Sequence, residues 1–193
     1  MPGSPLACRE LLALGQHPKM KEVQKVLAPD IVRWRQAPRL ATQYLSLFAR
    51  NRRHDLAIQL LAFMQCERVE CNRFHYNAAM SACEKSRQWQ FAIGLLREMH
   101  AIRLDPDATS YNTATSACEK GYHWRMAFSL LAEMPTVGLD PDTYSYNAAI
   151  SACEKGHQWQ LALGLLAVMV TVRLHPDTIS YSAAISACEK AAQ

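Results

Sequence analysis

Apolar residues recur with helical spacing along most of the chain, in paired segments separated by short polar breaks. Tyr146, Ala149, Ile150 and Cys153 stand at positions i, i+3, i+4 and i+7, which is the spacing of a helix with one buried stripe. After Gly156 the spacing resumes with Trp159, Ala162, Leu163, Leu166 and Met169. The pattern predicts two amphipathic helices joined by a turn at Gly156.

This pair of predicted helices recurs every 35 residues. The five letters SACEK begin at positions 81, 116, 151 and 186. In that register, full copies occupy residues 73–107, 108–142 and 143–177, and a fourth copy starts at 178 and stops at 193. A fixed period of this length indicates stacked copies of one structural unit.

An older copy precedes them in residues 38–72. Its apolar residues match those of the first full copy, and Arg50 stands where Lys85 does, but the Tyr that opens the first helix is replaced by Ala41. We therefore interpret 38–72 as a degenerate repeat. Residues 1–37 show short helical patterns outside the register, and we expect them to form an N-terminal helical cap or leader.

Each full copy closes on a Pro-Asp pair, at Pro106, Pro141 and Pro176. The proline marks the turn between copies, and the aspartate after it is well placed to cap the next helix. One helix-turn-helix hairpin of this size cannot bury its own apolar face, so the copies must stack. The sequence predicts an all-α fold, an α-solenoid of stacked hairpins forming a right-handed superhelix with a concave groove.

Composition narrows the class of protein. Half of the residues are hydrophobic and a fifth are charged, with seven Gly and nine Pro, which is typical of an ordered domain. No apolar run approaches the roughly 20 residues that span a bilayer, and the first twenty residues do not resemble a secretory signal. We expect an intracellular protein without a membrane partner. The formal charge of +4 is compatible with a polyanion partner.

The seven cysteines do not indicate metal or disulfide chemistry. Cys83, Cys118, Cys153 and Cys188 occur once per SACEK, so their spacing is that of the repeat, and no Cys-x-x-Cys pair is present. Equivalent positions in stacked repeats lie too far apart for a disulfide. We expect these side chains to pack between helices, with no zinc and no other cofactor.

No constellation of residues indicates catalysis. The seven histidines are scattered, and neither a glycine-rich phosphate loop nor a Ser-His-Asp or metal-ligand spacing is present. The sequence therefore predicts that this chain is not an enzyme and has no small-molecule substrate. It stops inside the first helix of a repeat, which indicates a fragment or a shortened gene model and leaves open a catalytic tail in a longer protein.

The period and the motifs together point to a family. Tetratricopeptide repeats run 34 residues, whereas this unit has 35, with Tyr111-Asn112 in the first helix, Met134 near the end of the second and Pro141-Asp142 in the turn. These residues and their counterparts resemble the pentatricopeptide repeat (PPR). The resemblance covers residues 73–190, and 38–72 more weakly, and the uninterrupted period is similar to the pure type of PPR array.

The resemblance implies binding of single-stranded RNA with one base read per repeat. In the family, the residue after the helix-opening Tyr and the last residue of the repeat choose the base, and Asn with Asp selects uridine. The corresponding pairs here are Asn77 with Asp107, Asn112 with Asp142, and Asn147 with Asp177. The family rule assigns adenine to Thr42 with Asn72, and Ser182 suggests a purine, which gives the footprint A-U-U-U-purine.

The base-selecting residues also have a simpler interpretation. Asp107, Asp142 and Asp177 would serve as helix caps in any helical repeat, and Asn is likewise a capping residue near a helix start.

A second set of residues in the resemblance concerns the RNA backbone. The basic residues Arg50, Lys85, Lys120, Lys155 and Lys190 recur near the end of each first helix, where the family often places a cation that contacts phosphate. The simpler explanation is that a cation there favours the helix dipole. We expect the Glu beside each Lys to face solvent.

A third set concerns the faces of the bases. The family places a residue that sandwiches the base two positions before the Tyr, and here these residues are Phe74, Thr109, Tyr144 and Ile179. The two aromatic residues suit stacking on bases, whereas Thr109 departs from the family pattern. We expect Trp89, Trp124 and Trp159, on the inner stripe of the second helix, to belong to the core.

Two functions follow as alternatives. The first is sequence-selective binding of single-stranded RNA in organellar RNA processing or stability, in a mitochondrion or plastid, with protein partners recruited to the RNA. The second is a protein-interaction scaffold that uses the concave groove. The repeated Asn/Asp pairs and the basic residues favour RNA, whereas loss of basic residues from the groove, or Asn and Asp both buried in capping bonds, would favour the scaffold.

Overall fold

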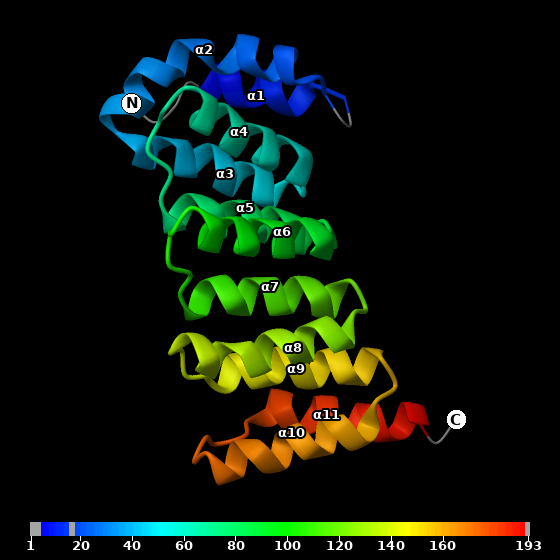
Figure 1. Cartoon of the computed structure of the whole chain (residues 1–193). Helices are drawn as coiled ribbons and strands as arrows, with labels where there is room; N and C mark the ends of the chain where they lie inside the picture. Colours follow the sequence, from blue (N-terminus) through cyan, green and yellow to red (C-terminus); the bar gives the residue numbers. More distant parts are fainter. Residues whose placement is uncertain (1–4, 16–17, 192–193) are drawn as a thin grey trace. The chain divides into compact units, whose positions relative to one another are not determined.

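The computed structural model describes residues 5–15 and 18–191, and within these ranges the chain consists of helices and connecting turns with no strand (Figure 1). The predicted cap and the last repeat therefore lie in part outside the described residues. The chain divides into two units, Met1–Asp105 and Pro106–Gln193, which are described separately below. The prediction of an all-α fold built from helical hairpins is confirmed.

Unit 1 contains three successive hairpins (Figure 1). Helix α1 packs against α2 and α3, α3 packs against α5, and α4 contacts both α3 and α5. The first helices thus form one layer and the second helices another, which is the stacking that the repeat predicted. The elements are α1 (Pro5–Ala13), α2 (Met20–Gln36), the 3₁₀ helix η1 (Pro38–Leu40), α3 (Ala41–Arg50), α4 (His54–Cys66), α5 (Arg73–Lys85) and α6 (Trp89–Ala101).

Unit 2 continues the same alternation in two further hairpins and one additional helix (Figure 1). Helix α9 packs between α7 and α11, and each second helix contacts its own first helix and the next one. The elements are α7 (Ala108–Lys120), α8 (Trp124–Glu133), the 3₁₀ helix η2 (Met134–Val137), α9 (Thr143–Lys155), α10 (Trp159–Thr171) and α11 (Thr178–Ala191). Pro135 follows the last residues of α8, where a proline disfavours further α-helix.

The turns within the four hairpins α3/α4, α5/α6, α7/α8 and α9/α10 each have a left-handed residue that is not glycine, namely Arg52, Arg87, Tyr122 and His157. Between α9 and α10, His157 has φ 55° and the N–H of Gln158 donates to the carbonyl of Cys153 at 2.9 Å. This is the bond of a Schellman turn, made at a conformational cost of about 1 kcal/mol because L residues disfavour positive φ. Gly156 itself has φ −89°, so the sequence located the turn correctly but attributed it to the wrong residue.

A glycine is needed at position 156 because the Trp124 ring lies close to it, and not because of the backbone angles. A Cβ atom on Gly156 would lie 2.2 Å from Cδ1 of Trp124. The indole of one repeat thus occupies the space that a side chain would need in the next.

The cysteine prediction is confirmed for three of the four repeats. Cys83, Cys118 and Cys153 are completely buried, and burial raises the pKa of the Cys83 and Cys118 thiols to about 12 and that of Cys153 to about 11. Cys188 is half-buried. Thiols this far from ionisation are weak nucleophiles and metal ligands.

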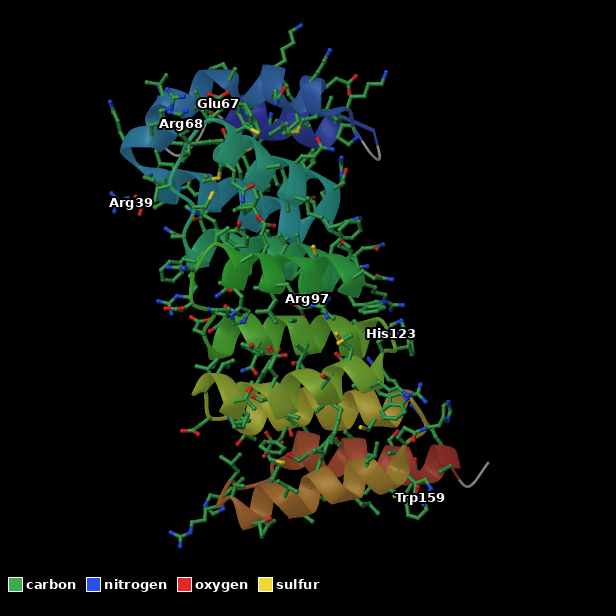
Figure 2. The ribbon with its side chains drawn as sticks, in the orientation of Figure 1. Arg39, Glu67, Arg68, Arg97, His123 and Trp159 are labelled. Atoms are coloured by element: carbon green, nitrogen blue, oxygen red, sulfur yellow. The ribbon has the colours of Figure 1, made fainter. Side chains whose placement is uncertain are left out.

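The predicted core of the second helices is partly wrong. Trp159 and Leu163 are about 40% exposed, and Figure 2 shows Trp159 at the start of α10. The buried side chains of α10 are instead Ala162, Leu165 and Met169. Because α10 is apolar almost all the way round, spacing alone could not select its inner face.

The other two tryptophans follow the same trend, since Trp89 and Trp124 are only half-buried. Each of the three indoles belongs to the first residue of a second helix. These positions lie directly after the turn within the hairpin, where the indoles remain partly accessible, so the core prediction for the tryptophans does not hold.

Candidate functional site

A cluster of three side chains joins consecutive repeats in unit 2. The amide nitrogen of Asn112, on α7, lies 3.4 Å from Oδ1 of Asp142, and its amide oxygen accepts from the hydroxyl of Ser145 at 2.6 Å. Asp142 also caps α9, because its Oδ1 accepts from the backbone N–H of Ser145 at 2.8 Å. The cap and the candidate base-selecting pair are therefore parts of one network.

The next repeat boundary has the same network with tighter geometry. The amide of Asn147 donates to both carboxylate oxygens of Asp177, at 3.0 and 3.2 Å. Ser180 donates to the amide oxygen of Asn147 at 2.5 Å, and its backbone N–H is capped by Asp177. Recurrence of one arrangement at two boundaries indicates that the repeat sequence itself specifies it.

The chemistry of the partners fixes the orientation of each amide. An ionised carboxylate can only accept, so the NH₂ group of Asn112 must face Asp142 and its oxygen must face Ser145. The pKa of Asp142 is lowered, since partial burial, which would raise it, is outweighed by hydrogen bonds from Ser145 and Asn112. The pKa of Asp177 is lowered mainly by the backbone N–H of Ser180. Both aspartates are therefore ionised at neutral pH.

In each Asn-Asp pair of the two networks the asparagine is buried and the aspartate is accessible to solvent. Asn112 and Asn147 are each 8% exposed, whereas Asp142 and Asp177 are exposed. The criterion for the scaffold alternative, burial of both Asn and Asp in capping bonds, is therefore not met, because the aspartates are exposed. The asparagines sit inside their helices, so they are not caps.

The remaining predicted base-selecting residues lie in less uniform surroundings. Asn77 is half-buried on α5 of unit 1, and Asp107 caps α7 of unit 2 by accepting from the N–H of Ser110 at 2.9 Å. Asn72 caps α5, where its side chain accepts from the N–H of His75 at 3.2 Å. Thr42 is half-buried and, together with Asn72, lines a hollow in unit 1.

The last position, Ser182, is exposed, and its hydroxyl donates to the carbonyl of Ile179 at 3.1 Å. The four predicted sandwiching residues share this exposure. Phe74 is 70% exposed, Tyr144 57% and Ile179 58%, and Thr109 is also exposed. Large apolar side chains left this open at the starts of first helices are available for contact with another molecule.

The basic residues fall into two groups. Lys155 forms an ion pair with Glu119 of the preceding repeat, and Lys190 pairs with Glu154 at 2.7 Å. Arg50 and Lys85 are exposed, and Lys120 is half-buried. The expectation that the glutamates beside the lysines face solvent is wrong for Glu119 and Glu154, because stacking brings each one beside the cation of the next repeat.

Sequence reasoning missed the serines that orient the asparagines. Ser145 and Ser180 are almost fully buried and combine capping of their own helix with the bond to the preceding repeat. The available signal was the spacing Asp-x-x-Ser after each Pro, which is the form of a capping box. In unit 1 the same position holds His75, whose Nε2 lies 2.9 Å from the Pro38 carbonyl.

The helix-opening tyrosines also have partners that the sequence did not reveal. Tyr76 donates to Glu98 at 2.7 Å and Tyr111 donates to Glu133 at 2.8 Å. Burial, followed by these carboxylates, raises the pKa of both phenols. The equivalent of the glutamates in the third repeat is Val168, so this position offers Tyr146 no carboxylate.

Within residues 5–15 and 18–191, no group of three or more His, Cys, Asp or Glu side chains could hold a metal ion. None of the helices described in these ranges is long and apolar enough to cross a membrane.

Family models identify the repeat. The PPR repeat family matches residues 106–155, the PPR repeat matches 74–104 and 144–173, and the pentatricopeptide repeat domain matches 41–86. The chain belongs to the pentatricopeptide repeat family. The PPR matches include most of the degenerate repeat, residues 38–72, as well as the full copies.

Solved structures of PPR proteins have the same fold. One is the PPR domain of Arabidopsis thaliana protein-only RNase P 1 in complex with tRNA, with TM-score 0.67, 18% identity, and 78% of this chain and 80% of that chain covered. Another is PPR10 in complex with an 18-nucleotide psaJ RNA element, with TM-score 0.70, 19% identity, and 89% of this chain covered. The match spans 26% of the PPR10 chain. No curated protein sequence matches significantly.

Proposed function

We propose that this PPR chain binds single-stranded RNA and reads one base per repeat. The observation that carries the proposal is the recurring Asn-Asp-Ser network, in which a buried amide is held in one orientation beside an exposed carboxylate. A fixed amide beside exposed stacking residues is what selective recognition of an unpaired base requires. The solved PPR structures in complex with tRNA and with psaJ RNA support the same class of ligand.

The proposed selectivity follows from the donor and acceptor groups of the asparagines that the network does not use. After bonding to Asp142 and Ser145, Asn112 keeps one N–H and one lone pair, which can meet the acceptor and donor on the Watson-Crick edge of uracil. Asn147 with Asp177 has the same capacity, and Asn77 with Asp107 has the same residue types. With Thr42 and Asn72 for adenine and Ser182 for a purine, the proposed footprint remains A-U-U-U-purine.

The basic residues proposed to contact phosphate differ in how readily they are available. Arg50 and Lys85 are exposed and without an ion-pair partner among the described residues, so they can meet a phosphate at once. Lys155 and Lys190 must first exchange a glutamate for a phosphate, and Lys120 stands at the equivalent position. The proposed role in organellar RNA processing or stability, in a mitochondrion or plastid, rests on the family resemblance, and it is a binding role without catalysis by this chain.

Binding is tested by fluorescence anisotropy with the purified chain and three labelled oligonucleotides, which are AUUUA RNA, an all-C RNA of equal length, and the DNA equivalent of AUUUA. Tighter binding of AUUUA RNA supports base reading. In Asn112→Thr this preference should fall by about 5- to 150-fold, since a mismatched contact costs about 1–3 kcal/mol. Equal binding of all three oligonucleotides with a steep salt dependence would reduce the function to electrostatic attraction.

The pairing of Lys155 and Lys190 with glutamates favours a second candidate, a scaffold that binds an extended peptide. The same assay separates the two functions. Absence of RNA binding at low salt, where phosphate contacts are strongest, would overturn the RNA proposal and leave the scaffold.

A further inference from the structure

A hollow of about 840 Å³ opens in unit 1 beside the degenerate repeat. Its walls include the base-selecting candidates Thr42 and Asn72 and the exposed ring of Phe74. Helix α1 supplies another wall through Arg9 and Leu12. A segment that the sequence left unassigned therefore borders the predicted RNA site.

The hollow is electropositive. Arg9, Arg39 and Arg50 line it, whereas no Asp or Glu does. Within the described part of the chain none of the three guanidinium groups forms an ion pair, in contrast to Lys155 and Lys190. Figure 2 shows the Arg39 side chain extending away from the ribbon near the start of α3. Unpaired arginines around one hollow can bind phosphate in bidentate geometry.

Arg39 also occupies a specific position in the repeat. It stands 35 residues before Phe74, which is the position of the predicted sandwiching residues. A guanidinium plane can stack on a base as an aromatic ring does. The hollow thus combines two stacking groups, Arg39 and Phe74, with the apolar side chain of Leu12.

Helix α1 is held in place by Arg53. The guanidinium of Arg53 donates to the carbonyls of Leu14 and Gly15, each at 3.0 Å, while it pairs with Asp55 at 2.8 Å. These bonds join the end of α1 to the start of α4. Arg9 is therefore presented to the hollow from a fixed helix.

We infer that α1 and the degenerate repeat form an additional nucleotide site, which holds the nucleotide immediately 5′ of the adenine assigned to Thr42 and Asn72. Arg9 and Arg50 contact its phosphate groups, and its base packs against Leu12 and Arg39. The hollow falls in the volume range of ligand sites, about 300–1,000 Å³. No Asn-Asp pair faces this nucleotide, so we expect affinity without base preference and a footprint of N-A-U-U-U-purine. The inference rests on the proposed RNA function.

Three RNAs test it, namely AUUUA, a 5′-extended NAUUUA pool and a 3′-extended AUUUAN pool, in which N is an equal mixture of the four bases. The two pools have the same length and charge. We expect the chain to bind the 5′-extended pool at least about fivefold more tightly than AUUUA, which is the scale of one stacked base. The 3′ extension should give a smaller gain. In Arg9→Ala the 5′ advantage should fall below about twofold, and Arg9→Lys should restore part of it.

The matched control is Arg33→Ala, which removes one exposed arginine of α2 outside the hollow and should keep the 5′ advantage. Equal gains from the two extensions, or a 5′ advantage that survives in Arg9→Ala, would overturn the inference while AUUUA binding upholds the proposed function. If AUUUA itself does not bind, the proposed function fails and the inference fails with it.

Discussion

At the scale of single residues, the repeat uses one polar side chain for several tasks. Asp142 caps α9, orients the amide of Asn112 and remains exposed. Ser145 bonds to that cap and to the amide oxygen of the preceding repeat. Because stability and the proposed base recognition share these atoms, a substitution of Asp142 would disturb both. A substitution of Asn112, which caps no helix, separates them better.

The third repeat offers a test of the tyrosine-glutamate bond. Tyr146 is 8% exposed, and its hydroxyl has no hydrogen-bond partner among the residues that the structure describes. We expect Val168→Glu to supply the missing acceptor and to raise the free energy of unfolding by about 1 kcal/mol, a typical net value for one hydrogen bond. Val168 is 42% exposed, so little apolar burial is lost. Urea denaturation followed by circular dichroism measures the change.

The control is Val168→Glu in a Tyr146→Phe background, where no hydroxyl is available. A double-mutant cycle isolates the pair. Equal stabilisation with and without the hydroxyl would contradict the assigned bond.

At the scale of helices, the first and second helices of a hairpin are stabilised differently. The helix starts at Asn72, Asp107 and Asp142 are capped by side chains, whereas the second helices start without a side-chain cap. The second helices depend instead on packing and on the turns that precede them. The approach of Trp124 to Gly156 is one such packing contact.

Gly156→Ala should therefore destabilise unit 2. The new methyl group would overlap the Trp124 ring, and overpacking of this kind costs about 1–3 kcal/mol. Gly164→Ala is the matched control in α10, since nothing lies within 4 Å of its Cβ position. That substitution should stabilise by up to about 1 kcal/mol through helix propensity. A loss of stability in both variants, measured by thermal unfolding, would show that the Trp124 contact is not the cause.

At the scale of the whole molecule, the net charge is +4, but the cationic side chains differ in whether they form ion pairs. In unit 1, Arg9, Arg39 and Arg50 around the hollow form no ion pair with another described residue, whereas in unit 2 Lys155 and Lys190 pair with glutamates of the preceding repeat. These partly buried ion pairs contribute on the order of 1 kcal/mol each to stability. They do, however, reduce the positive field that a polyanion would encounter.

Releasing one lysine should therefore strengthen RNA binding. Glu119→Gln leaves Lys155 without its partner, and Glu189→Gln makes the same charge change at the same repeat position, where no ion pair is present among the described residues. We expect Glu119→Gln to raise AUUUA affinity more than Glu189→Gln and to steepen the salt dependence by about one phosphate contact. Anisotropy at several salt concentrations gives both values, and indistinguishable variants would exclude Lys155 from phosphate binding.

The sequence alone determined the architecture, because a 35-residue period with helical spacing and Pro-Asp turns leaves stacked hairpins as the way to bury the apolar stripes. It also located the candidate base-selecting positions, which recur in register. Only the tertiary structure decided how these residues are partnered. Whether Trp159 is buried, whether Lys155 is available, and whether α1 borders the site depend on contacts between residues far apart in the chain. A local pattern contains no information on such contacts, so they became apparent only when the hairpins were stacked.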